Sequence, residues 1–409
     1  MTGPDRTLFW LAAAAFASMA SMRICDPMLP VIATDFDVPT SAAAGVVTTY
    51  TIGYGFAQLV HGPLGDRFGK GRYIAGAAIA AAFASLVCAF APGLASLELG
   101  RLLTGAIAAA IIPLSMAWIG DTVPYEQRQA TLAKYLNGTI LGLILGQSMG
   151  GALADTVGWR SAFLILTAIF ALAGWQLRAA VRRRESSNQA AAASAQSTDP
   201  TGRTAHAIPA GTLDRYRIVI REAWARVILI VVALEGLLAF GALAFVPTWL
   251  HERGGLPLWM AGATVAAFGI GGFLYTVNAA KLVRRLGESG LALAGGGVLA
   301  AGFALLAATP GALSGAIACA MIGLGYHMLH NTLQTNATQM APAVRGTAVA
   351  LFAMSLFIGQ SIGVGVAAQA VGAGGFVAIF AVAAGGLLAL GAAFARLLQQ
   401  RGLQTARST

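Results

Sequence analysis

Long apolar runs, separated by short polar segments, follow one another along the whole chain. Each run is close to the about 20 residues that a helix needs to cross the hydrocarbon core of a bilayer. The runs are too long, and alternate too little, for the strands of a barrel. The pattern therefore predicts twelve transmembrane helices. The predicted spans are residues 8–32, 43–62, 74–92, 96–119, 130–153, 159–178, 225–250, 258–280, 289–308, 312–333, 346–370 and 375–395.

The composition agrees with a membrane protein of the all-α class. Hydrophobic residues make up 57% of the 409 residues and charged residues only 10%, whereas about one quarter of a soluble protein is charged. The first span, with Arg6 ahead of an apolar run, has the outline of a signal peptide. Because eleven further spans follow, we expect it to be retained as the first helix.

The positive charges predict the orientation of the chain. With the N-terminus inside, all but four of the 26 Lys and Arg residues fall in inner loops, the termini or a central linker, the four being Arg23, Arg101, Arg160 and Arg253. By the positive-inside rule both termini are then cytoplasmic, and we expect a multi-pass protein of the cell (inner) membrane. The net charge of +10 reflects this topology and does not predict a nucleic-acid partner, because the charges do not gather on one folded face.

A polar segment divides the helices into six and six. Residues 183–222 include "SSNQAAAASAQSTDPTGRTAHAIPAG", a small, polar stretch of low complexity, which is typical of a mobile linker. We therefore predict an N-terminal six-helix bundle over residues 1–182, a cytoplasmic linker over 183–222 and a C-terminal six-helix bundle over 223–409.

The two halves repeat each other at an offset of 217 or 218 residues. The words "LGQSMGG" (145–151) and "IGQSIGV" (358–364) also match, four residues short of that offset, which is about one helical turn. Parallel six-helix repeats around an axis along the membrane normal place a substrate path between the halves, and rocking of the halves gives alternating access. The other matching pairs are Pro30 and Pro247, Gly69 and Gly287, Arg128 and Arg345, and Phe163 and Phe380.

The loop after the second predicted helix carries a family motif. "GPLGDRFGKGR" resembles the loop signature of the major facilitator superfamily, G-x-L-x-D-R-x-G-(K/R)-x-(K/R), and with the helix pattern and the repeat the resemblance covers nearly the whole chain. It implies the two-bundle transporter fold of that superfamily, a small-molecule substrate and the family's usual monomer. The matching residues are Gly62, Leu64, Asp66, Arg67, Gly69, Lys70 and Arg72.

In the family this loop forms a cytoplasmic latch. Asp66 is placed to meet the positive N-terminus of a helix, and the resemblance implies Arg345, at the start of the eleventh helix, as its partner in the other half. The second half has Arg284 in "AKLVRRLG" in place of the acid, so we expect a one-sided latch. The alternative is a plain positive-inside turn.

Three ionisable residues inside the predicted spans are the candidates for proton coupling. Arg101 opens "RLLTG", which resembles the R-x-x-x-G signature of proton-coupled antiporters, and a buried arginine needs an anion or a polar cavity. Asp26, with Arg23 one turn before it, is the expected partner; alternatively, Arg101 reaches the outer interface beside Glu98. Glu235 has no cation near it in the sequence, and burial alone favours its neutral form. A helix–helix hydrogen bond is the other interpretation of Glu235.

The fifth predicted helix carries glycines on one face. Gly138, Gly142, Gly146 and Gly150 are each four residues apart, so that another helix can approach closely. The region resembles the antiporter signature G-x-x-x-G-P-x-x-G-G, but Gln147 stands where proline is expected. This departure leaves a uniporter or symporter open.

Polar side chains at helical spacing mark a candidate cavity or, alternatively, helix packing. His327 and His330 lack the ligand set and spacing of a zinc site, and no metal or cofactor is predicted. The cavity candidates are Arg23, Tyr50, Tyr54, Gln58, Gln147, His327, His330, Asn331, Gln334 and Gln360.

These observations predict a secondary transporter whose partners are the lipid bilayer, a small-molecule substrate and protons. The leading hypothesis is proton-coupled efflux, by antiport, of a drug-like or sugar-like compound. One alternative is a proton-linked importer or facilitator of a small metabolite, and another is a membrane sensor that does not transport. The sequence has no nucleophile elbow or phosphate loop and no metal-ligand set, so we do not expect an enzyme.

Overall fold

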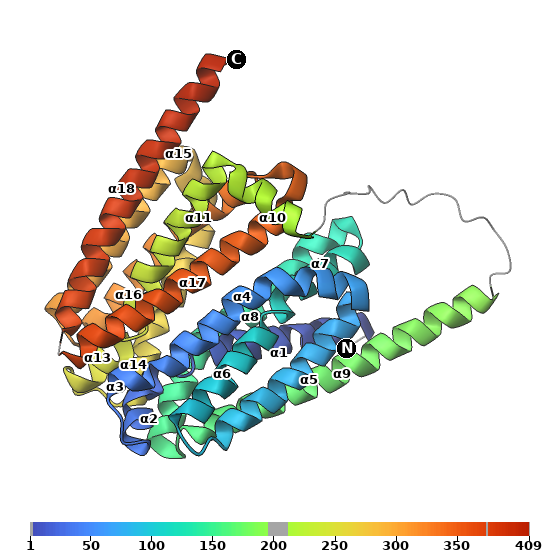
Figure 1. Ribbon diagram of the computed structural model, residues 1–409, viewed down its shortest axis with the longest axis horizontal. Helices are drawn as coiled ribbons and strands as arrows, with labels where there is room; N and C mark the ends of the chain where they lie inside the picture. The colour runs from blue at the N-terminus through green and yellow to red at the C-terminus, as the bar shows by residue number, and fades with distance from the viewer. Residues whose placement is uncertain (1–2, 195–211, 374, 409) are drawn as a thin grey trace.

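Helices form every regular element of the described residues. The computed structural model describes residues 3–194, 212–373 and 375–408, which fold into two groups of helices that lie side by side (Figure 1). The first half comprises α1 (Gly3–Arg23), η1 (Asp26–Met28), α2 (Leu29–Asp35), α3 (Thr40–Ala43), α4 (Gly45–Phe68), α5 (Lys70–Ala89), α6 (Leu94–Ala108), α7 (Ile111–Thr122), α8 (Tyr125–Thr156) and α9 (Arg160–Ser194).

The second half repeats this plan. It comprises α10 (Thr212–Arg221), α11 (Ala223–Glu235), the π-helical turn η2 (Gly236–Phe240), α12 (Gly241–Leu243), α13 (Val246–Glu252), α14 (Leu258–Val265), α15 (Ala267–Ala308), α16 (Ala312–Ala337), η3 (Pro342–Val344), α17 (Arg345–Gly372) and α18 (Phe376–Ser408).

The all-α membrane fold is confirmed, and each predicted span coincides with a helix or a run of short helices. Among the described residues nine helical segments are long and apolar enough to cross a membrane. One of the nine, Leu258–Ala308, holds two predicted spans, which a non-helical backbone at Gly287 separates inside α15. The two remaining predicted spans, 43–62 and 130–153, coincide with α4 and α8.

The repeat is visible in the backbone. Left-handed residues turn the chain at matching places, since φ is 52° at Asp37 and 66° at Gly255, and 83° at Gly69 and 64° at Gly287. The first span of each half is broken into short helices, and a proline opens the continuation after the break, in α2 and in α13. The two halves thus share breaks and turns as well as a helix order.

The halves meet along two helix pairs, α4 with α17 and α8 with α14 (Figure 1). Within each half, glycines allow the backbones to approach closely. A Cβ atom at Gly142 of α8 would lie 2.3 Å from the Phe16 carbonyl oxygen of α1, and one at Gly363 of α17 would lie 2.1 Å from the Leu237 carbonyl oxygen of η2. Gly138 and Gly146 face α1 in the same way, and Gly150 faces Ile24 directly after α1.

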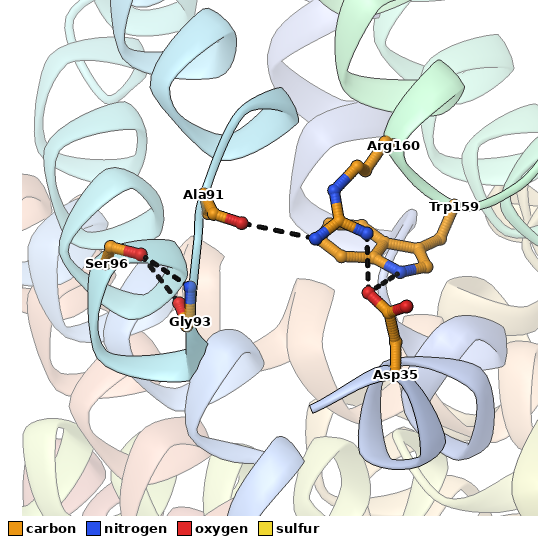
Figure 2. Close-up of polar contacts among 6 residues, drawn as sticks. All are labelled: Asp35, Ala91, Gly93, Ser96, Trp159 and Arg160. Carbon is orange, nitrogen blue, oxygen red and sulfur yellow. Dashed lines mark hydrogen bonds and ion pairs between the residues drawn. The ribbon is translucent and has the colours of Figure 1, made fainter. Parts of the chain in front are cut away.

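One end of the first half, which we call the Asp35 face, is tied together by a polar cluster (Figure 2). Asp35 at the end of α2 accepts hydrogen bonds from Trp159 Nε1 at 3.2 Å and from Arg160 Nη1 at 2.5 Å. Arg160 Nη2 donates to the Ala91 carbonyl in the loop before α6 at 3.2 Å. The start of α9 is thereby fixed to two other connections.

The other end, the Asp66 face, is hollowed. A cavity of about 440 Å³ lies between the α4–α5 turn, α7 and α9. Its lining residues include Thr7, Asp66, Lys70, Trp118, Asp121 and Val181.

Helices cover both ends of the predicted linker. α9 continues to Ser194, and α10 occupies Thr212–Arg221. Residues 195–211, which include Arg203, lie outside the described residues, so the predicted mobility of the linker stays a prediction there.

Candidate functional site

Asp26 is fully buried where the first span breaks. α1 ends at Arg23 and the 3-10 turn η1 begins at Asp26, which places the two side chains together. Asp26 Oδ2 accepts hydrogen bonds from Arg23 Nη1 at 3.3 Å and from Gln147 Nε2 at 3.0 Å, while Oδ1 has no partner. The glycines on either side of Gln147 bring α8 against α1, and this is why the amide can reach the carboxylate.

The predicted pairing of Arg101 with Asp26 is wrong. Arg101 Nε donates to the Val46 carbonyl at 3.0 Å, and Nη1 donates to the carbonyl and hydroxyl of Ser21 at 2.8 and 3.2 Å. Ser21 lies in the last turn of α1, where the carbonyls have no helical N–H partner. The Arg101 guanidinium also lies 4.2 Å from the centre of the Tyr50 ring. Because the residue is fully buried, the alternative in which Arg101 reaches the interface is wrong as well.

Glu235 has a partner that the sequence did not reveal. His330 Nδ1 of α16 and Glu235 Oε2 share a hydrogen bond of 2.7 Å, and Glu235 Oε1 has no partner. The acid is fully buried at the end of α11, directly before the π-helical turn η2. The alternative of a helix–helix hydrogen bond at Glu235 is therefore what the structure shows, and the partner is a residue 95 positions away.

Two aromatic side chains connect the acids of the two halves. The Arg23 guanidinium lies 4.5 Å from the centre of the Phe240 ring, across the boundary between the halves. Phe240 contacts Tyr326 edge-on at 5.0 Å, and Tyr326 stacks on His330 at 4.7 Å between ring centres. Sequence analysis missed both rings, because an aromatic residue in an apolar span normally indicates packing. We call the following set the central site: Arg23, Asp26, Gln147, Glu235, Phe240, Tyr326 and His330.

Of the other polar cavity candidates, some pack within one half and some lie at the boundary between the halves. Tyr50 donates to the Ser18 carbonyl at 3.0 Å, whereas Tyr54 packs against Phe357 of the second half with ring centres 4.6 Å apart. Gln58 and Asn331 are half-buried and Gln334 is exposed. His327 bonds Gly323 of its own helix at 2.7 Å.

Gln360, the repeat partner of Gln147, is in a different environment. Its side chain is 1% exposed, and neither amide atom has a hydrogen-bond partner. The two copies of the repeated word therefore do not make the same contacts.

The predicted pair of Asp66 with Arg345 is not formed. Asp66 pairs with Lys70 at 3.4 Å, and Lys70 pairs with Asp121 at 2.6 Å, all within the first half. A Cβ atom added at Gly62 or Gly346 would meet nothing within 4 Å, so there is open space beside both glycines.

Contacts between the halves instead lie deeper and toward the Asp35 face. The hydroxyls of Thr51 and Ser361 are 2.7 Å apart, and Asp155 accepts a bond from the Trp259 backbone N–H at 2.8 Å. These contacts join the halves at the Asp35 face and deeper in the molecule.

Relatives with a similar sequence are described as transporters. Putative uncharacterized transporter YgaY of Escherichia coli (strain K12) is 31% identical over 187 residues, which are 43% of this chain and 46% of that protein. The chain thus spans about half the length of this relative. YwfA of Bacillus subtilis (strain 168), an uncharacterized MFS-type transporter, is 23% identical over 90% of this chain and 86% of its own. Multidrug export protein EmrB of Haemophilus influenzae is 28% identical over 38% of this chain and 30% of its own.

The fold is shared with solved transporter structures. A bacterial homolog of the human lysosomal transporter Spinster, in an inward-facing and unoccupied conformation, superposes with a TM-score of 0.74. It is 18% identical, and the match covers 99% of both chains. The family model of the Major Facilitator Superfamily matches residues 11–364. The chain therefore belongs to the major facilitator superfamily.

Proposed function

We propose that this transporter exports a small organic solute, drug-like or sugar-like, in exchange for protons. The observation that carries the proposal is the central site, in which one fully buried carboxyl group of each half keeps an oxygen without a partner. Buried acids in a membrane are costly and mark proton or substrate paths. The likeness to the export protein EmrB supports the outward direction.

Proton binding would act on contacts that join the halves. A proton on Asp26 weakens its bonds to Arg23 and Gln147, and Arg23 is also the residue that lies on Phe240 of the second half. A proton on the Glu235–His330 pair acts at the other end of the same line of contacts. Protonation at either end thus changes how the halves are held together, and a solute bound between them is released.

The orientation follows from the basic loops. Arg67, Lys70 and Arg72 lie at the Asp66 face, which the positive-inside rule assigns to the cytoplasm. The contacts at the Asp35 face then close the outer side, and the structure represents a state closed to the outside. We place the protein in the cell (inner) membrane with both termini in the cytoplasm.

A proton-linked importer or facilitator is the second candidate. It is favoured by Gln147, which stands where the antiporter signature has proline and which binds Asp26 directly. The same carboxyl group would then take up a proton together with the solute.

The test uses purified protein in liposomes that hold a pH-sensitive dye. A panel of cationic drugs, sugars and carboxylates is added under an imposed proton gradient, to the wild type and to Asp26→Asn. We expect at least one compound to dissipate the gradient through the wild type and not through the variant. Asp37→Asn is the matched control, because it makes the same change at an exposed carboxylate.

Two outcomes would contradict the proposal. A compound that crosses wild type and Asp26→Asn equally, without proton flux, would establish a facilitator. Proton and solute moving in the same direction would establish the importer.

A further inference from the structure

The short helix α10 connects the two halves at the Asp66 face. It belongs to the second half, where it packs against α11, α17 and η3 (Figure 1). Val219 of α10 is fully buried. From this helix Tyr216 donates its hydroxyl to the Leu59 carbonyl of α4, in the first half, at 2.8 Å.

Pro63 explains why this carbonyl accepts the bond. In an α-helix the carbonyl of Leu59 would pair with the N–H of residue 63, four positions on. Proline has no N–H, and Pro63 lies inside α4, so the helical bond cannot form. The Leu59 carbonyl therefore has no helical donor, and Tyr216 supplies one from the other half.

We propose that α10 is a brace: through the Tyr216–Leu59 bond it holds the halves in the state that is closed at the Asp35 face. When the halves rock, α4 moves relative to α17 and α10, and the bond breaks. The inference rests on the rocking of the halves in the proposed function, and it is independent of the solute and of the proton.

The test measures the distance between the halves at the Asp35 face. Spin labels on Ser41→Cys and Ala373→Cys report whether this face is closed or open, because α3 and the end of α17 lie close together, with Gly372 beside Ser41. The three native cysteines are buried and remain unlabelled. In the full chain, reconstituted in bilayers, we expect two distance populations.

Tyr216→Phe removes only the hydroxyl. A hydrogen bond of ordinary net strength should shift the ratio of the populations toward the open state by about twofold to tenfold. Pro63→Ala should shift it in the same direction, because it returns an N–H to Leu59 inside α4. In the Pro63→Ala background, Tyr216→Phe should then have a smaller effect, since the two changes act on one bond.

Tyr73→Phe is the matched control. It also removes a phenolic hydroxyl, but that hydroxyl bonds His61 within the first half at 3.0 Å, so it should leave the ratio unchanged. Two populations whose ratio does not respond to Tyr216→Phe would overturn the brace and leave the proposed function intact. A single distance in every variant would overturn both. Additive effects of Tyr216→Phe and Pro63→Ala would overturn the role of the freed carbonyl.

Discussion

At the scale of single residues, the central site is a set of buried ionisable groups that meet one another by hydrogen bonds and ring contacts. Glu235 has one oxygen bonded to His330 and one without a partner, and it is fully buried. Removing one partner from a buried charged pair leaves the other with an uncompensated cost of desolvation. The pair should therefore be sensitive to the loss of either side chain alone.

His330→Ala should lower the stability of the protein by ~3 kcal/mol, because Glu235 would then be buried without its donor. Adding Glu235→Gln should recover part of this loss, since a neutral amide is less costly to bury. The thermal midpoints of the single and double variants in detergent measure both effects. Equal midpoints for wild type and His330→Ala would contradict the role of the pair.

The sequence could identify Asp26, Arg101 and Glu235 as candidates, because a charge inside an apolar run is visible without a structure. It could not identify their partners. Arg101 bonds the Ser21 carbonyl, which lies in the last turn of α1, and Glu235 depends on the packing of α16 beside α11. Helix ends and helix neighbours are products of the tertiary fold, so local sequence patterns do not contain them.

At the scale of elements, glycine determines which helices touch. The stripe on α8 allows its contact with α1, and α17 approaches η2 through Gly363 in the same way. In a membrane there is little hydrophobic drive between helices, so such close packing contributes much of the association. The spacing of the glycines made this contact surface predictable, although the partner helix was not.

Gly142→Ala should separate α1 from α8 and lower the melting temperature, because the new Cβ would lie 2.3 Å from a backbone oxygen that cannot turn away. Gly76→Ala in α5 is the matched control, since a Cβ there meets nothing within 4 Å. It should be neutral or stabilise α5 by up to ~1 kcal/mol through helix propensity. Equal losses in both variants would contradict the packing argument.

Gly287→Ala should destabilise the turn inside α15. With φ at 64° and ψ at −179°, the backbone of Gly287 is in a region that is essentially restricted to glycine, and alanine there costs about 1–3 kcal/mol. Gly290→Ala, in the same helix but without positive φ, is the control. A melting temperature that falls only for Gly290→Ala would refute this explanation of the turn.

At the scale of the whole molecule, the halves are joined at the Asp35 face, through the central site and, at the Asp66 face, through the bond from Tyr216 to Leu59. The twelve spans and the repeat were predictable because each needs only the order of apolar runs. The absence of the Asp66–Arg345 pair could not be predicted, because a contact between the halves depends on which state the molecule adopts. One sequence encodes several such states, and a motif does not say which of them is present.

A disulfide between Thr51→Cys and Ser361→Cys should lock the molecule in this state. The two hydroxyl oxygens are 2.7 Å apart across the boundary, near enough for a bond between sulfurs after a small adjustment. We expect solute flux to stop on oxidation and to return on reduction, with each single variant unaffected by the oxidant. Undiminished flux through the cross-linked protein would show that the α4–α17 contact does not open.

The partners of Arg101 have a further consequence. A guanidinium held by carbonyls and a hydroxyl keeps its charge whatever the pH, so the centre of the first half, with Arg23, Arg101 and an ionised Asp26, carries one net positive charge. A proton on Asp26 raises it to two. Each elementary charge gains about 2.3 kcal/mol on crossing 100 mV. In the proposed exchange, the membrane voltage would therefore exert a larger force on the first half when Asp26 carries a proton. Even an uncharged solute would then be exported at a rate that depends on voltage.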